Sequence, residues 1–183
     1  VASYERLLGL EPERLDARRA LALTYARLDR PDDVVRNAKP VLRARPEDQD
    51  LLLAFARAQS QKGRAAEAAE AAGTLVRLAP KSVDALWELA AAEVALGREE
   101  GAIATLERAF VLPEGPPRVS ARLDTLVRKR AAELSERGDH EAALAANRRA
   151  RLEQWIVLHT ALGGNPTKAT PLATPASTAN GKQ

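Results

Sequence analysis

The chain has 183 residues, enough for one domain of ordinary size, and its 45% hydrophobic fraction includes only 3% aromatic residues. Its 28 basic and 25 acidic residues give a formal net charge of +3, which demands neither a nucleic-acid nor a membrane partner. The absence of Cys excludes a disulfide framework, a thiol nucleophile and thiolate metal ligands. Because aromatic residues are so few, the core must consist mainly of Ala, Leu and Val, which suits closely packed helices.

Three sets of residues repeat along the chain with one period. Pro12, Pro46 and Pro80 are spaced by 34 residues, as are Gly63 and Gly97, and Pro113 follows Pro80 by 33. The same spacing separates three aspartates, Asp16, Asp50 and Asp84. Glycine suits the left-handed residue that ends a helix, and proline cannot continue a helix interior. The pattern predicts an all-α chain of helix pairs, each closed by a Gly turn and followed by a Pro turn.

The predicted organisation follows from this punctuation. Residues 1–14 end a preceding repeat, residues 15–48, 49–82 and 83–112 form three repeats, and residues 113–123 form an insertion loop and helix start. A divergent fourth repeat with an extended capping helix occupies residues 124–162, and residues 163–183 are a low-complexity tail. Helix breaks are expected near Pro12, Gly63, Pro80, Gly97, Pro113 and Gly138. Pro40 conflicts with its helical context and predicts a kink there or a break near Lys39.

These features resemble the tetratricopeptide repeat over residues 4–162. The small residue at the eighth position of that motif is matched by Ala22, Ala56 and Ala90. The large residue at the seventh position is matched by Leu21, Phe55 and Leu89, and Tyr25 matches the aromatic at the eleventh. The motif's frequent Trp at the fourth position is missing. The resemblance implies an α-solenoid of antiparallel helix pairs forming a right-handed superhelix.

The resemblance also implies a concave groove lined by the first helix of each repeat. Carried over position by position, the partner-binding residues of that groove are Arg19, Leu23, Leu53, Arg57, Trp87 and Arg128, with Arg27 and Gln61 near its edge. Trp and Arg dominate protein interfaces, which favours a protein or peptide segment as the partner. For Trp87 the alternative is a buried side chain that fills a gap between repeats.

The sequence offers few residues suited to catalysis, metal binding or nucleic-acid binding. His140 reads as a turn residue, and His159 as a packing or surface residue, so no catalytic residue, metal site or cofactor is expected. Asp16, Asp50 and Asp84 could form a site for a cation or basic peptide, but a favourable position in the first turn of a helix explains them better. The basic cluster around Arg128 lacks interleaved aromatics, so nucleic acid is not the expected partner.

A second docking face is predicted on the extended last helix. Leu152, Trp155, Ile156 and His159 share one face of that helix. Either this stripe folds back to cap the array, or it docks a partner or a second copy of the chain.

The leading hypothesis is a non-enzymatic scaffold or assembly adaptor, and the alternative is a regulatory or substrate-recruiting domain of a larger enzyme. The chain has no Met, so we expect that it is a fragment or that an upstream segment was removed. Frequent Arg and Ala are typical of a GC-rich bacterial genome. No apolar run is long enough for a membrane span, which leaves a cytoplasmic or an envelope-associated location open, with the envelope favoured.

Overall fold

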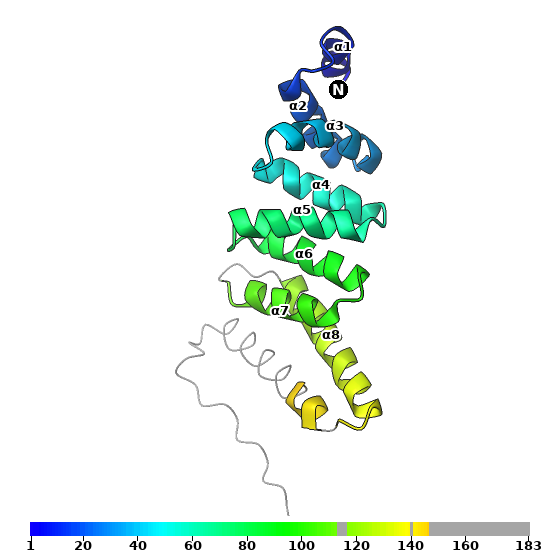
Figure 1. Ribbon diagram of the computed structural model, residues 1–183, viewed down its shortest axis with the longest axis vertical. Helices are drawn as coiled ribbons and strands as arrows, with labels where there is room; N and C mark the ends of the chain where they lie inside the picture. The colour runs from blue at the N-terminus through cyan, green and yellow to red at the C-terminus, as the bar shows by residue number, and fades with distance from the viewer. Residues whose placement is uncertain (113–116, 140, 147–183) are drawn as a thin grey trace, which may run out of the picture. The chain divides into compact units, whose positions relative to one another are not determined.

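The computed structural model describes residues 1–112, 117–139 and 141–146, and every regular element within them is an α-helix (Figure 1). The helices are α1 (Ala2–Leu10), α2 (Leu15–Arg27), α3 (Pro31–Ala44), α4 (Gln49–Gln61), α5 (Ala65–Leu78), α6 (Val83–Ala95), α7 (Glu99–Phe110) and α8 (Pro117–Glu136). Residues 141–146 are also helical. The predicted all-α class is therefore confirmed. The expectations for Pro113, His140, the docking stripe from Leu152 to His159 and the tail lie outside the described residues.

The chain divides into two units, Val1–Leu126 and Val127–Gln183, and α8 contributes residues to both. In the first unit each helix from α1 to α7 packs against the next, and α2 also packs against α4 and α4 against α6. Helices α2, α4 and α6 thus form an inner layer, and α3, α5 and α7 alternate with them as outer helices. In the second unit Val127, Ala131 and Ala143 are buried.

Small buried residues recur where the helices meet. Ala22, Ala56 and Ala90 are fully buried on the three inner helices, and Ala68 and Ala102 are fully buried on α5 and α7. A methyl group at these points lets the helix backbones approach closely, as ridges-into-grooves packing requires. Around them, larger side chains such as Leu21, Leu51 and Leu86 complete the core.

Each turn inside a helix pair contains one residue with left-handed backbone. The predicted glycines have φ values of 69° (Gly63), 72° (Gly97) and 82° (Gly138), and Asp29 takes the same role in the first pair with φ of 53°. The following amide then donates to the carbonyl five residues before it, as in Arg64 N to Gln59 O (2.9 Å) and Arg98 N to Glu93 O (2.8 Å). This is the hydrogen bond of a Schellman motif, and it satisfies carbonyls at the helix end.

The turns between pairs repeat a second conformation. Glu11, Arg45 and Ala79 each precede a proline, and their φ and ψ values lie within a few degrees of one another, at −128°/78°, −133°/75° and −132°/74°. Proline disfavours α-helical backbone in the preceding residue, so each helix ends there. Asp48 and Ser82 then cap α4 and α6 by accepting from Leu51 N and Ala85 N, both at 3.2 Å. The helix breaks predicted near Pro12, Gly63, Pro80, Gly97 and Gly138 are all found.

The break expected near Lys39 is wrong, because α3 runs without interruption from Pro31 to Ala44 with Pro40 inside it. Proline removes one backbone donor, and the carbonyl that loses its partner belongs to Arg36, an exposed residue that water can reach. Ala38 and Val41 on either side of Pro40 are fully buried. Their packing holds the helix together across the missing hydrogen bond.

One fully buried side-chain amide lacks a hydrogen-bond partner among the described residues. The side chain of Gln59 on α4 is fully buried, and neither of its amide atoms has a hydrogen-bond partner among the described residues. The equivalent residues one period away are satisfied: Tyr25 donates to Glu5, and Glu93 accepts from Thr105 at 2.9 Å. The carboxylate of Glu5, together with burial, raises the pKa of the Tyr25 hydroxyl. Ala71 stands one period before Thr105, so α5 offers Gln59 no hydroxyl.

The first prediction contrasts two glycines. Gly97→Ala should lower the free energy of unfolding by ~1–2 kcal/mol, because its φ of 72° is unfavourable for any residue with a Cβ. Gly73→Ala in the interior of α5 should raise it by ~1 kcal/mol, because alanine favours the helix and a Cβ meets nothing within 4 Å. Urea unfolding of both variants measures the difference. A destabilising Gly73→Ala would contradict the assignment of that residue to a helix with open space around it.

The second prediction concerns the unpaired amide. Ala71→Thr should place a hydroxyl where Thr105 stands in the next helix pair, and a hydrogen bond to Gln59 should raise stability by ~1 kcal/mol. Ala71→Val has nearly the same shape without the hydroxyl and is the matched control. Thermal unfolding should rank the Thr variant above the Val variant; equal melting temperatures would show that Gln59 gains no partner from this position.

Candidate protein-binding groove

A groove of about 560 Å³ opens between the inner helices α2 and α4. Its lining comprises residues from both helices, from the turn after α2 and from the start of α3: Leu23, Ala26, Arg27, Asp29, Arg30, Pro31, Val34, Asp50, Leu53, Ala54, Arg57, Ala58 and Gln61. The helical spacing places Leu23 and Arg27 one turn apart on α2, and Leu53 and Arg57 one turn apart on α4. Two matching pairs of one leucine and one arginine therefore face the same opening.

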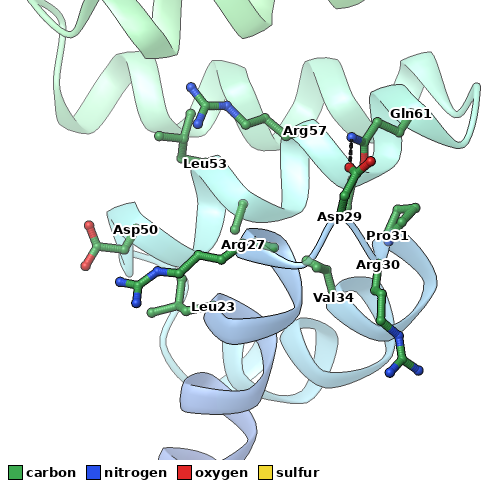
Figure 2. Close-up of a pocket in the computed structure, with 13 residues that line it drawn as sticks. Leu23, Arg27, Asp29, Arg30, Pro31, Val34, Asp50, Leu53, Arg57 and Gln61 are labelled. Atoms are coloured by element: carbon green, nitrogen blue, oxygen red, sulfur yellow. Dashed lines mark hydrogen bonds between the residues drawn. The ribbon is translucent and has the colours of Figure 1, made fainter. Parts of the chain in front are cut away.

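The close-up view shows how these pairs lie (Figure 2). Leu23 and Leu53 point to the same side, with the guanidinium group of Arg27 beside Leu23 and that of Arg57 beside Leu53, whereas Arg30 points away. At one end of the groove the Gln61 amide donates to Asp29 at 2.6 Å, which joins α4 to the turn after α2. The groove thus combines half-buried leucines with charged side chains that reach solvent.

Arg19 on α2 is held by carboxylates at the start of α4. Its Nε and Nη2 donate to the two oxygens of Asp48 at 2.5 and 3.0 Å, and Nη2 also donates to Asp50 at 3.0 Å. These contacts raise the pKa of Arg19. Burial acts to raise the pKa of Asp48, but the hydrogen bonds from Arg19 and from the Leu51 amide outweigh it, so the pKa falls below its ordinary 3.8. A bidentate arginine pair of this kind fixes both the distance and the orientation of two helices.

Arg57 makes the corresponding link from α4 to α6. Its Nε donates to Glu88 and its Nη2 to Asp84, both at 2.8 Å. The Glu88 side chain is only 10% exposed, so this pair lies at the edge of the core. Arg27 differs from both, because its side chain makes no ion pair or hydrogen bond within the described residues. Among the groove arginines, Arg27 is therefore a cation open to a ligand.

The three spaced aspartates have a structural explanation. Each lies in the first turn of an inner helix, where the helix dipole favours a negative charge, as expected. Each also accepts an ion pair from another helix or turn: Asp16 from Arg45 at 2.7 Å, Asp50 from Arg19 and Asp84 from Arg57. No group of three or more acidic or histidine residues suited to a metal ion occurs within the described residues.

The predicted groove residues are distributed over several places. Leu23, Leu53 and Arg57 line the groove together, and so do Arg27 and Gln61, which the sequence placed only at its edge. Arg19 lies outside the lining, bound to Asp48 and Asp50. Trp87 is half-buried on α6, one period after Leu53, and is not part of this lining. Arg128 is exposed on the part of α8 that belongs to the second unit. The sequence missed Asp29 and Val34, although the period marks Asp29 as the counterpart of Gly63.

Paired helices with a repeating turn pattern and an open inner layer define an α-solenoid, a class of helical-repeat protein. Solved structures with the same fold include MamA, with a TM-score of 0.67 and 16% identity over 85% of this chain and 81% of that chain. The first TPR domain of human RPAP3 has a TM-score of 0.58 and 19% identity, over 68% of this chain and 98% of that chain. TTC0263, a thermophilic TPR protein of Thermus thermophilus, has a TM-score of 0.51 and 22% identity, over 80% of this chain and 77% of that chain. No family model and no curated protein matches the sequence. The chain therefore has the fold of tetratricopeptide-repeat proteins.

The third prediction tests the Arg19 pair at Asp48. Asp48→Asn keeps a side chain that caps α4 but loses the charge, and should cost ~0.5–1 kcal/mol. Asp48→Ala loses the cap as well and should cost ~1–2 kcal/mol in total. Urea unfolding at neutral pH measures both.

The pH dependence follows from the lowered pKa of Asp48. The unfolded chain binds the proton more tightly, so the stabilisation is present above the ordinary pKa of 3.8 and is lost as pH falls through the lower folded value. The native chain should therefore lose more stability than Asp48→Asn over that window. Parallel pH profiles for the two proteins would show that the pair contributes nothing.

Proposed function

We propose that the chain is a protein-interaction scaffold that holds a segment of a partner protein in the groove between α2 and α4. The observation that supports this proposal is that Leu23, Leu53 and Arg27 line the same groove, and that Arg27 is a cation without a partner among the described residues. Half-buried leucines offer apolar area, and an unpaired arginine offers a directional contact for a carboxylate.

The chemistry of the partner segment follows from the same residues. Since Arg57 is engaged by Asp84 and Glu88, the affinity must come chiefly from apolar side chains placed over Leu23, Leu53 and Ala54. An acidic side chain beside Arg27 sets the direction of the segment. Trp87 lies on the next inner helix and extends the proposed contact surface for a longer segment. We infer a bacterial chain from its composition, with no further assignment of compartment; within the described residues no helix is long and apolar enough to cross a bilayer.

The fourth prediction uses a photo-crosslinking amino acid in the source cell. Placed at Leu53, it should give a discrete adduct with a partner protein, because this side chain faces the groove. Placed at Ala66, an exposed position on the outer helix α5, it should not give that adduct. Helical content by circular dichroism controls for folding of both variants.

The purified partner then allows a quantitative test. Leu53→Asp should weaken its binding at least about tenfold, since a charge replaces apolar contact area, and Arg27→Ala should weaken it about fivefold through the lost carboxylate contact. Lys81→Ala, an exposed cation in the turn after α5, is the matched control for charge. The absence of any adduct at Leu53, or an identical adduct at Ala66, would exclude this groove as the site.

A further inference from the structure

A second cleft of about 430 Å³ lies between the outer helices α3 and α5 and is lined at its base by α4. Its lining shares no residue with the inner groove: Lys39, Leu42 and Arg43 come from α3, Pro46 from the following turn, Leu52, Phe55 and Gln59 from α4, and Glu67, Glu70, Ala71 and Thr74 from α5. The α4 residues recur at spacings of three and four, so they form one face of that helix. Leu53 and Arg57 on α4 line the inner groove, so the two openings use different faces of α4.

The charges of this cleft are separated by sign. Lys39 and Arg43 lie four residues apart on α3, and Glu67 and Glu70 lie three apart on α5. All four are exposed, and none makes an ion pair or side-chain hydrogen bond within the described part of the chain. Elsewhere in the first unit, arginines such as Arg19, Arg45 and Arg57 pair with carboxylates of other helices. The cations of α3 and the carboxylates of α5 thus line the same cleft without pairing with each other.

The base of the cleft is apolar with one exception. Leu42, Leu52, Phe55 and Ala71 supply the apolar area, and Gln59 supplies the buried amide whose two polar atoms have no partner. An unpaired buried amide costs ~1–3 kcal/mol. A peptide group carries one donor and one acceptor, which are the complements of the Gln59 oxygen and nitrogen.

We propose that this outer cleft is a second docking site and that its occupant is a polypeptide segment of a partner protein. The segment carries acidic side chains along the edge that faces Lys39 and Arg43, basic side chains along the edge that faces Glu67 and Glu70, and apolar side chains between them. A lone anion or cation satisfies only one side of the cleft, and an uncharged apolar helix leaves all four charges without partners. The occupant therefore has both signs of charge, separated by an apolar strip.

The experiment selects ligands from a displayed library of random peptides. The bait is the whole chain with Leu53→Asp, which disables the inner groove. The reversed protein is this bait with four further substitutions: Lys39→Glu, Arg43→Glu, Glu67→Lys and Glu70→Lys. Peptides that also bind the reversed protein are removed. The remaining peptides should show the acidic, apolar and basic pattern. All four substituted residues are exposed, but Glu67 lies in the first turn of α5 and Arg43 in the last turn of α3. Reversal of these two charges opposes the helix dipoles, so the reversed protein should melt somewhat below the bait and keep its helical content.

Charge exchange gives the decisive readout. Each selected peptide should bind the reversed protein at least about tenfold more weakly, and the same peptide with its acidic and basic residues exchanged should bind the reversed protein and not the original. Gln59→Leu should weaken binding without lowering the melting temperature, because it removes the unpaired amide. Three results would overturn the proposal: no peptide that depends on the four charges, peptides that carry only one sign of charge, or self-association of the chain that charge reversal abolishes, which would identify a second copy as the occupant.

Discussion

The close approach of neighbouring helices across buried alanines is the constraint on which the rest of the first unit depends. Ala22, Ala56 and Ala90 have no side chain beyond Cβ, so the inner helices can come near enough for other contacts to span them. Arg19 reaches the start of α4, and Arg57 reaches the start of α6, only because of this proximity. A larger residue at any of these points separates two helices and breaks the arginine contacts at the same time.

The arginines of the inner layer divide into two groups through this geometry. Arg19 and Arg57 bind carboxylates on the next inner helix and so act between helix pairs. Arg27 makes no such contact within the described residues. Composition alone cannot make this distinction, because all three arginines occur on inner helices. Of these three arginines, only Arg27 is open to a ligand within the described residues. The groove is therefore an apolar surface with one open arginine rather than a basic surface.

The sequence was sufficient for the helices and turns because their causes are local. Gly63 and Gly97 end helices through their own backbone freedom, and proline acts on the residue before it. Asp29 escaped notice because aspartate is only occasionally left-handed, and its role follows from the period rather than from its identity. Of the two outcomes expected at Pro40, the break was wrong for the opposite reason: the local effect of proline is real, but the burial of Ala38 and Val41 keeps the helix continuous. The pairing of Arg19 with Asp48 joins residues 29 apart in the chain and could not be found without the fold.

The outer cleft shows a further limit of repeat-based reasoning. A repeat motif describes what its units share, whereas the unpaired amide at this cleft occurs where one unit differs. Tyr25 and Glu93 find partners in Glu5 and Thr105, but Gln59 meets Ala71 and remains unpaired. An alanine in place of a threonine leaves the amide without a hydroxyl partner from α5. In a solenoid every helix pair packs in the same way, so stability alone favours a hydroxyl partner for the buried residue of each pair. A pair that lacks this hydroxyl is therefore better evidence for binding than a feature that all the pairs share.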